Sequence, residues 1–353
     1  MISNQDNIYQ GSPETLLITG GAGFIGSNFI HYILKKYPNY KVINLDSLTY
    51  AGNIENLKEV EANNYQFIKG DICDSNLIEN VFSSFEPTYV INFAAESHVD
   101  RSIKDPQIFL KTNISGTQIL LDACKRHWGS GSHEKKFLQV STDEVYGSLG
   151  ATGYFTEETP LAPNSPYSAS KASADLYVRA YHETFGLNVN ITRCSNNYGP
   201  YQFPEKLIPL MISNALEDKD LPIYGDGMNI RDWLYVEDHC SAIDLVLHQG
   251  TSGEIYNVGG YNEKANIEIV KIILKEMGKP TSLIKFVKDR LGHDKRYAID
   301  ASKIKDELGW EPTIMFEEGI RKTIGWYLQN QKWLDRVKSG EYAEYYHNMY
   351  IEK

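Results

Sequence analysis

The feature that most constrains this chain is a glycine-rich turn that directly follows a short apolar run near its beginning. Residues 15–19 are apolar or β-branched, which is typical of a buried parallel strand. Gly20, Gly23 and Gly26 come next, and apolar side chains then recur at helical spacing. Between a strand and a helix, such glycines let the backbone approach a pyrophosphate, which binds to amide groups at the helix N-terminus. The stretch therefore predicts a dinucleotide site, with a purely structural turn as the alternative.

The residue that ends the second expected strand discriminates between NAD and NADP. Residues 41–45 form an apolar run that ends at Asp46. An acidic residue in this place can accept hydrogen bonds from the ribose hydroxyls of adenosine, and it would repel the 2′-phosphate of NADP. The pattern therefore favours NAD over NADP.

Two further strand patterns end in residues that suit the same cofactor. Residues 65–69 lead to Asp71, which we expect near the adenine amino group or, alternatively, as a turn residue. Residues 89–93 lead to Ala94 and Ala95, whose small side chains leave room for a cofactor across the strand end. Strands that alternate with helical patterns predict an α/β fold, namely a Rossmann-type doubly wound parallel sheet.

A group of polar residues after a later strand carries the predicted acid/base chemistry. A buried strand is expected over residues 137–140. Thr142, Asp143 and Glu144 follow it, at the carboxyl end of the strand, where ligands bind in open α/β sheets. A hydroxyl group and two carboxyl groups are therefore predicted to lie side by side at the ligand site.

A tyrosine and a lysine are predicted to form a base at the same site. Ser165 is a good helix N-cap and Pro166 suits the first helical turn, so a helix is expected from there. Tyr167 and Lys171 are four residues apart and project from one face of that helix. A phenol has a pKa of about 10 and is a poor base at neutral pH, but a nearby ammonium group favours the phenolate.

Composition limits the partners and the compartment. A net charge of −11 argues against nucleic acid or an anionic membrane surface as the main partner. The four cysteines are widely spaced without a CxxC pair, which indicates reduced thiols. We find no N-terminal signal pattern and no apolar run of membrane-spanning length, and we expect a cytoplasmic protein.

The expected helices and strands become shorter after about residue 200, where proline and glycine residues interrupt them. We expect a NAD-binding Rossmann domain over residues 14–195, with a return segment near 233–262. Residues 196–232 and 263–340 are expected to form a smaller C-terminal substrate-binding domain. Cationic side chains in these loop-rich segments suggest a clamp for a diphosphate.

These motifs resemble the extended short-chain dehydrogenase/reductase family along nearly the whole chain. The glycine turn, Asp46 and the Tyr–Lys pair mark that family generally. Residues 142–144, 231–233 and 289–297 are similar to its dTDP-glucose 4,6-dehydratases. The Asp–Glu pair is the sharpest signal, because 4-epimerases have no need of such an acid/base pair and GDP-mannose dehydratases usually carry serine in place of this aspartate.

The resemblance implies a reaction of dTDP-glucose, in the route to dTDP-rhamnose and other deoxysugars, with NAD that is held tightly and regenerated. Tyr167 takes the proton of the C4 hydroxyl group while hydride leaves C4. Glu144 then removes the C5 proton while Asp143 protonates the departing C6 hydroxyl group. Hydride returns to C6, which gives dTDP-4-keto-6-deoxy-glucose and water. Thr142 is expected to align the C4 oxygen, and Lys171 to lower the phenol pKa and hold the nicotinamide ribose.

The motifs and the resemblance together assign the binding residues. The residues expected to contact NAD are Gly20, Gly23, Phe24, Ile25, Gly26, Asp46, Asp71, Ile72, Ala94, Ala95, Ser97, Thr112, Tyr167, Lys171 and Asn197. The residues expected to contact the sugar nucleotide are Ser97, His98, Thr142, Asn196, Lys206, Leu207, Pro222, Tyr224, Arg231, Asn266, Arg290 and His293. No metal ligand is expected. Thr112 and Asn113 are expected to open a helix. His98 is expected to contact the sugar nucleotide or, alternatively, to have a purely structural role.

Two other functions remain open from the sequence. One is a different sugar-nucleotide enzyme of the same fold, such as a UDP-sugar 4-epimerase, a UDP-glucuronate decarboxylase or a UDP-glucose 4,6-dehydratase. The other is a non-enzymatic NAD-binding regulator, which predicts a broken Tyr–Lys pair, whereas this pair is intact. The resemblance also implies a homodimer that forms through the helices near 105–125 and 167–185.

Overall fold

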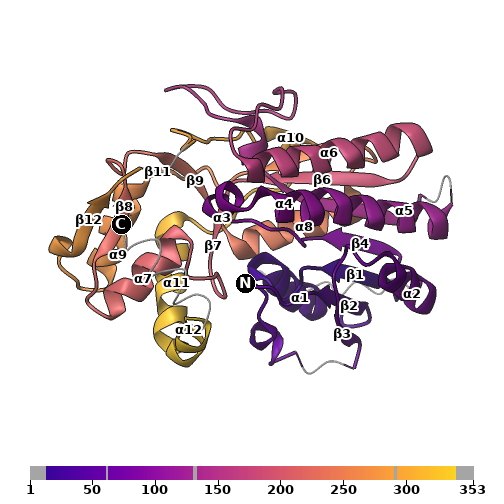
Figure 1. Cartoon of the computed structure of the whole chain (residues 1–353), viewed down its shortest axis with the longest axis horizontal. Coiled ribbons are helices and arrows are strands. Elements are labelled where there is room, and N and C mark those ends of the chain that lie inside the picture. The colour runs from indigo at the N-terminus through magenta and orange to yellow at the C-terminus, as the bar shows by residue number, and fades with distance from the viewer. Residues whose placement is uncertain (1–12, 61–62, 130–132, 290–291, 339–353) are drawn as a thin grey trace, which may run out of the picture.

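The computed structural model describes residues 13–60, 63–129, 133–289 and 292–338, which form a large sheet-based lobe and a smaller lobe at the left of Figure 1. The large lobe contains a seven-stranded sheet in which every pair of neighbouring strands is parallel. In order across the sheet the strands are β10 (Ile255–Val258), β6 (Val189–Cys194), β5 (Lys136–Thr142), β4 (Tyr89–Asn92), β1 (Thr15–Thr19), β2 (Lys41–Asp46) and β3 (Tyr65–Lys69). The strand order reverses between β1 and β4, which is the switch point where such sheets bind ligands. The predicted Rossmann-type doubly wound sheet is confirmed.

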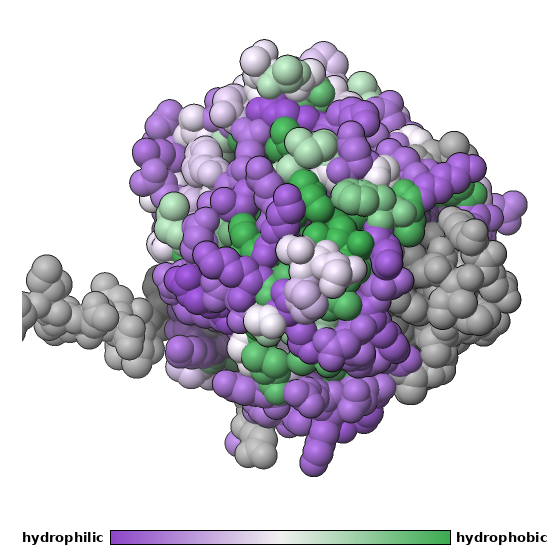
Figure 2. All heavy atoms as spheres, turned by 90° about the vertical axis from the view of Figure 1, so that its left-hand side faces the viewer, coloured by the Kyte–Doolittle hydropathy of each residue, from purple (hydrophilic) through white to green (hydrophobic). Residues whose placement is uncertain are grey.

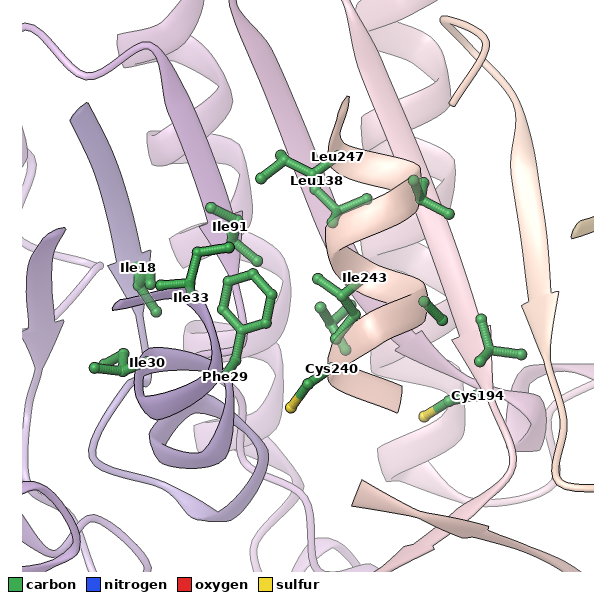
Figure 3. Packing of buried hydrophobic residues seen from close by; sticks show 14 of the residues in the cluster. Ile18, Phe29, Ile30, Ile33, Ile91, Leu138, Cys194, Cys240, Ile243 and Leu247 are labelled. Carbon is green, nitrogen blue, oxygen red and sulfur yellow. The ribbon is translucent and has the colours of Figure 1, made fainter. Parts of the chain in front are cut away.

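Helices cover both faces of this sheet because its strands are apolar on both sides. Leu16 packs toward one face of the sheet and Leu17 toward the other, as alternation along a strand requires. On the first face lie α1 (Phe24–Lys36) and α8 (Val236–Gln249), whose apolar side chains meet in the core that Figure 3 shows. On the second face lie α2 (Ser75–Phe85), α5 (Thr117–Trp128) and α6 (Pro166–Phe185).

The smaller lobe has a hydrophobic core of its own. Its sheets have the strand orders β11-β9-β7 and β12-β8. The strands are β7 (Asn196–Tyr198), β8 (Leu221–Tyr224), β9 (Ile230–Tyr235), β11 (Glu263–Ala265) and β12 (Ile284–Val287). The helices are α7 (Leu207–Leu216), α9 (Asn266–Glu276), the short η4 (Thr281–Leu283), α11 (Phe316–Gln329) and α12 (Gln331–Val337), whereas α10 (Ser302–Leu308) packs beside β10. Figure 2 shows the face of the molecule at this end, where hydrophobic residues gather between hydrophilic ones.

Short helical segments connect the strand ends to the site. They are η1 (Ile54–Leu57), α3 (Val99–Lys104), α4 (Pro106–Phe109), the π-helical η2 (Leu110–Gly116) and η3 (Asp143–Tyr146). In the part of the chain described here, none of the helices combines the length and the apolar character needed to cross a membrane.

The expectation that Thr112 and Asn113 open a helix is wrong. The helical run begins earlier, where the Asp105 side chain accepts a hydrogen bond from the Gln107 amide and Pro106 occupies the first turn. Both residues lie inside η2, a π-helical stretch of a kind that often marks functional sites. Asn113 binds the Glu96 backbone through both of its side-chain atoms, at 2.9 and 3.0 Å.

Candidate active site

A cavity of about 370 Å³ lies across the carboxyl ends of β1, β2, β4 and β5. Its wall runs from the glycine turn through Asp46 and the end of β4 to the start of η3 and the first turns of α6. This position matches the switch point of the sheet. The residues predicted to bind the dinucleotide and those predicted to carry the acid/base chemistry therefore share one site.

The glycine turn has the shape that a pyrophosphate needs. Gly20 has a φ of +71°, and a Cβ atom added there would lie 2.6 Å from the Ala94 amide nitrogen. At Gly26 an added Cβ would lie 2.4 Å from the Gly20 carbonyl oxygen. Larger residues at these two positions would therefore push the turn apart. Gly23 immediately precedes α1, so the exposed amide groups of that helix face the cavity wall formed by the turn.

Asp46 is the last residue of β2 and is held in place by the backbone. Its carboxylate accepts hydrogen bonds from the Ala22 amide at 2.9 Å and from the Leu48 amide at 2.7 Å. Burial raises the pKa of Asp46, and these two amides partly offset that rise. Each carboxylate oxygen has a second lone pair. The geometry therefore leaves Asp46 able to accept hydrogen bonds from a ribose.

The acid/base residues follow β5, which is two residues longer at this end than the sequence indicated. The Thr142 hydroxyl group caps η3 by accepting a hydrogen bond from the Glu144 amide at 3.3 Å, and it donates to Asp143 at 3.3 Å. Asp143 is 2% exposed. Burial raises the pKa of Asp143 well above its usual range, and the negative charges of Glu144 and Asp232 raise it further. A carboxyl group whose pKa is raised in this way holds its proton more firmly than a free aspartate does, which suits the role of an acid.

Helix α6 presents the other two predicted catalytic residues. Ser165 and Ser168 form a capping box at its start, so the helix begins where the sequence predicted. Tyr167 and Lys171 are both buried and line the cavity. The Lys171 amino group donates a hydrogen bond to the Val140 carbonyl oxygen at 2.8 Å.

The pKa of Tyr167 differs from the expectation that its helix neighbour lowers it. Burial raises this pKa well above 10, and the Glu144 carboxylate and the Cys194 thiol add to the rise, while a hydrogen bond with Thr142 partly offsets it. Burial also lowers the pKa of Lys171. The surroundings of Tyr167 therefore favour the neutral phenol, and a nearby positive charge would favour the phenolate.

The positions expected to contact the dinucleotide all line the same cavity. They are Gly20, Gly23, Phe24, Ile25, Gly26, Asp46, Asp71, Ile72, Ala94, Ala95, Ser97, Thr112, Tyr167, Lys171 and Asn197. Asp71 accepts a hydrogen bond from the Cys73 amide at 2.9 Å, so it also has the turn role that was its alternative. One cavity thus joins the glycine turn, which suits a pyrophosphate, to the Asp46 carboxylate, which suits a ribose, and this combination fits a dinucleotide.

The positions expected to contact the sugar nucleotide fall into two groups. Ser97, Thr142, Asn196 and Lys206 line the cavity. Outside its wall, among the described residues, lie His98, Leu207, Pro222, Tyr224, Arg231, Asn266 and His293. Arg290 lies outside the described residues. His98 is buried at the start of α3, which suits its alternative structural role.

Three residues of the second group make contacts outside the cavity wall, and two of them contact each other. The Tyr224 and His293 rings lie edge to face with centroids 6.2 Å apart, and the His293 Nδ1 atom lies 2.6 Å from the Asp289 carboxylate. Arg231 lies over the Tyr297 ring at 4.2 Å and donates to the Asp294 carbonyl oxygen at 3.0 Å. The smaller lobe thus holds an aromatic ring against a histidine, and an arginine against a second ring, outside the cavity wall.

Sequence reasoning missed part of the cavity wall. Thr49, Glu96, Gln202, Phe203 and Glu205 also line it. Glu96 directly follows Ala95 at the end of β4, so the strand-end rule that selected the alanines would have found it. The other four lie in loops whose approach to the cavity depends on contacts between distant segments.

Comparison with known proteins places this chain among nucleotide-sugar enzymes. Residues 17–323 match the sequence model of the family described as GDP-mannose 4,6 dehydratase. A dTDP-glucose 4,6-dehydratase of Xanthomonas campestris pv. campestris is 55% identical over 342 residues, which cover 93% of this chain and 97% of the relative. The dTDP-glucose 4,6-dehydratase of Salmonella typhimurium is 52% identical, and the match covers 95% of this chain and 98% of the relative.

Solved structures agree with these sequence matches. The crystal structure of a dTDP-glucose 4,6-dehydratase from Bacillus anthracis in complex with NAD has a TM-score of 0.85 and 55% identity, and the match covers 92% of this chain and 100% of that chain. The UDP-glucose 4-epimerase of Thermotoga maritima is also similar, with a TM-score of 0.83 but 30% identity, over 90% of this chain and 99% of that chain.

Proposed function

The chain belongs to the GDP-mannose 4,6 dehydratase family, and we propose that within this family it is an NAD-dependent hydro-lyase that converts dTDP-glucose to dTDP-4-keto-6-deoxy-glucose and water. Curated relatives that are 51–55% identical over more than nine tenths of this chain carry that activity in their names. A solved relative at 55% identity holds NAD.

One observation carries the proposal beyond the family. Asp143, whose pKa is raised by burial, lies in one cavity with Glu144, Thr142 and Tyr167. Elimination of water needs an acid for the leaving hydroxyl group and a base for the carbon acid, and these are two groups that a 4-epimerase does not need. The environment of Asp143 suits the acid.

NAD, when bound, supplies a hydride acceptor for the first stage and a hydride donor for the last. We assign the proton transfers to the protein. Tyr167 accepts the proton of the C4 hydroxyl group, and Thr142 holds the C4 oxygen. Glu144 accepts the C5 proton, which the new 4-ketone makes acidic, and Asp143 donates its proton to the C6 hydroxyl group so that water leaves. Because burial favours the neutral phenol, Tyr167 needs a positive charge nearby; Lys171 supplies one, and an oxidised nicotinamide ring would add another.

We assign NAD to residues 14–195 with the return segment near 233–262, and the sugar nucleotide to residues 196–232 and 263–340. The base stacks on Tyr224, and the diphosphate is bound by Lys206, Arg231 and His293. Two observations support this assignment. The Tyr224 and His293 rings contact each other, and Lys206 lines the cavity.

The protein works as a homodimer in the cytoplasm. Apolar side chains are exposed on the two helical segments expected to pair, namely Ile108, Leu110, Leu176, Tyr177 and Phe185. All four cysteines are free, as a reducing compartment requires. Sedimentation analysis of Leu176→Glu beside the unchanged protein tests the pairing: the variant should be monomeric, and an unaltered dimer would place the interface elsewhere.

The experiment that tests the activity is a comparison of three substrates. The protein is incubated with dTDP-glucose, UDP-glucose and GDP-mannose in turn, and the 4-keto-6-deoxy product is measured. Rapid product formation from dTDP-glucose alone is expected. Interconversion of sugars at C4 without loss of water would instead identify an epimerase.

A further inference from the structure

Two walls of the NAD cavity come from segments that are far apart in the sequence. The loop after β2 contributes Thr49, and the segment before α7 contributes Phe203 and Glu205. Within the described part of the chain, Arg101 of α3 is absent from this wall and lines a neighbouring hollow. Arg101 nevertheless contacts both segments.

The contacts of Arg101 join the two walls directly. Its guanidinium carbon lies 3.7 Å from the centroid of the Tyr50 ring, in the loop after β2. Its Nε atom donates to the Glu205 carboxylate at 3.4 Å. The Tyr50 ring also meets the Phe203 ring edge to face, with centroids 5.8 Å apart. We call Tyr50, Arg101 and Glu205 the Arg101 clamp.

The clamp is built from groups that depend on each other. The Glu205 side chain is 1% exposed and the Arg101 side chain 26% exposed. Burial raises the pKa of Glu205, and the nearby positive charges of Lys206 and Arg101, followed by hydrogen bonds with Tyr50 and Arg101, partly offset that rise. A buried carboxyl group of this kind is costly without such partners, so the loss of Arg101 should loosen Glu205. Burial, followed by the Glu205 and Glu96 carboxylates, raises the pKa of Tyr50 well above its ordinary value, so the ring under the guanidinium stays neutral.

The segment that carries Glu205 needs such support. It begins at Tyr201, a non-glycine residue with a φ of +66°, which is a backbone conformation that costs energy. The Tyr201 ring packs on Trp326 with centroids 4.7 Å apart, which holds the first end of the segment. At its last end Lys206 donates to the Ser97 carbonyl oxygen at 2.9 Å. Between these two ends, Arg101 holds Glu205.

We propose that Arg101 is a positioning residue that holds the 47–52 loop and the 202–206 segment together against the NAD cavity and thereby slows release of NAD. This inference extends the proposed function, since an enzyme that regenerates its cofactor in each cycle benefits from slow cofactor release. It rests on the NAD site alone and does not depend on which nucleotide sugar is the substrate.

The test uses the full-length protein loaded with NAD. In Arg101→Gln the charge pair and the stacked cation are both lost, so the closed arrangement is populated less and NAD should leave about tenfold faster or more. The rate is measured without substrate, from the NAD that remains bound after rapid passage through a desalting column. With saturating NAD added, turnover of dTDP-glucose should return close to that of the unchanged protein, because Arg101 does not touch the reacting atoms.

The control is Arg126→Gln, which removes an exposed ion pair between Arg126 of α5 and Glu79 of α2, neither of which lines the cavity. It makes the same chemical change and should leave the NAD release rate unaltered. Tyr50→Leu removes the ring under the guanidinium group. If Arg101→Gln does not fold, the NAD release rate of Tyr50→Leu tests the proposal in its place.

Two results would overturn the proposal. One is a release rate in the clamp variants equal to that of the Arg126→Gln control. The other is activity that stays low at saturating NAD, which would assign Arg101 to the chemistry or to the substrate. A failure of the dTDP-glucose assignment would alter neither the NAD release rates nor their comparison, so the two ideas fail separately.

Discussion

Replacing Asp143 by asparagine and Glu144 by glutamine should separate oxidation at C4 from loss of water. Both substitutions preserve shape, and both remove a transferable proton or its acceptor. Burial raises the pKa of Asp143 and so favours its neutral form, which asparagine matches in shape and charge. We therefore expect the free energy of unfolding to change by about 1 kcal/mol or less.

The expected kinetic loss is large but confined to one stage. General acid or base catalysis contributes about 10²–10⁴-fold, which corresponds to roughly 3–5.5 kcal/mol of barrier. If both carboxyl groups act on the same step, as we propose, the double variant should lose about as much as the worse single variant rather than the product of both losses. Removal of the C4 proton depends on Tyr167 and should persist.

The assay is a single turnover of dTDP-glucose by the NAD-loaded protein, with NADH absorbance and 4-keto-6-deoxy product followed separately. NADH should accumulate while product formation is slow. Glu157→Gln is the matched control, because Glu157 is a carboxylate whose pKa is also raised by burial but which binds the Asn257 amide outside the cavity. Unimpaired loss of water in the double variant would refute the assigned roles. Equal loss of both stages would show that the pair only maintains the loop.

Four further outcomes are expected. Tyr167→Phe should reduce turnover by at least about 10²-fold, and near-normal kcat would exclude the tyrosine as the base. NAD should bind about tenfold or more tightly than NADP because the Asp46 carboxylate would repel a 2′-phosphate; equal dissociation constants by calorimetry would contradict this. Asp175→Ala leaves the buried Arg193 cation without its carboxylate partner at 2.9 Å and should cost about 3–5 kcal/mol of unfolding free energy, measured in urea, whereas a small loss would mean that water replaces the pair. Burial lowers the pKa of Lys136 to about 8, below that of the unfolded chain, so the unfolded state binds more protons above pH 8. The unfolding free energy should therefore rise from about pH 8 to pH 10 relative to Lys136→Met, and parallel pH profiles would refute this.

The prediction of the fold succeeded where the signal lies within one element. The strand, glycine turn and helix over residues 15–36 follow from apolar spacing and from backbone geometry that only glycine allows, and both are local properties. The start of α6 follows in the same way from the Ser165 cap, and the four-residue spacing that it starts brings Tyr167 and Lys171 into one cavity.

Tertiary structure decided what depends on distant neighbours. Thr112 was misplaced because its helix starts at an earlier cap and passes through a π-helical stretch, in which Asn113 binds the Glu96 backbone in the segment after β4. The pKa of Tyr167 rises, contrary to the local Tyr–Lys pattern, because burial and the Glu144 carboxylate raise it.

The Arg101 clamp shows the physical limit of sequence reasoning most clearly. Tyr50, Arg101 and Glu205 are about fifty and one hundred residues apart along the chain, so no spacing or periodicity relates them. Sequence periodicity specifies which face of each element is buried, and thereby the sheet and the carboxyl edge where ligands bind. Which loops meet above that edge, and which charges become buried there, is decided only when the two lobes pack together.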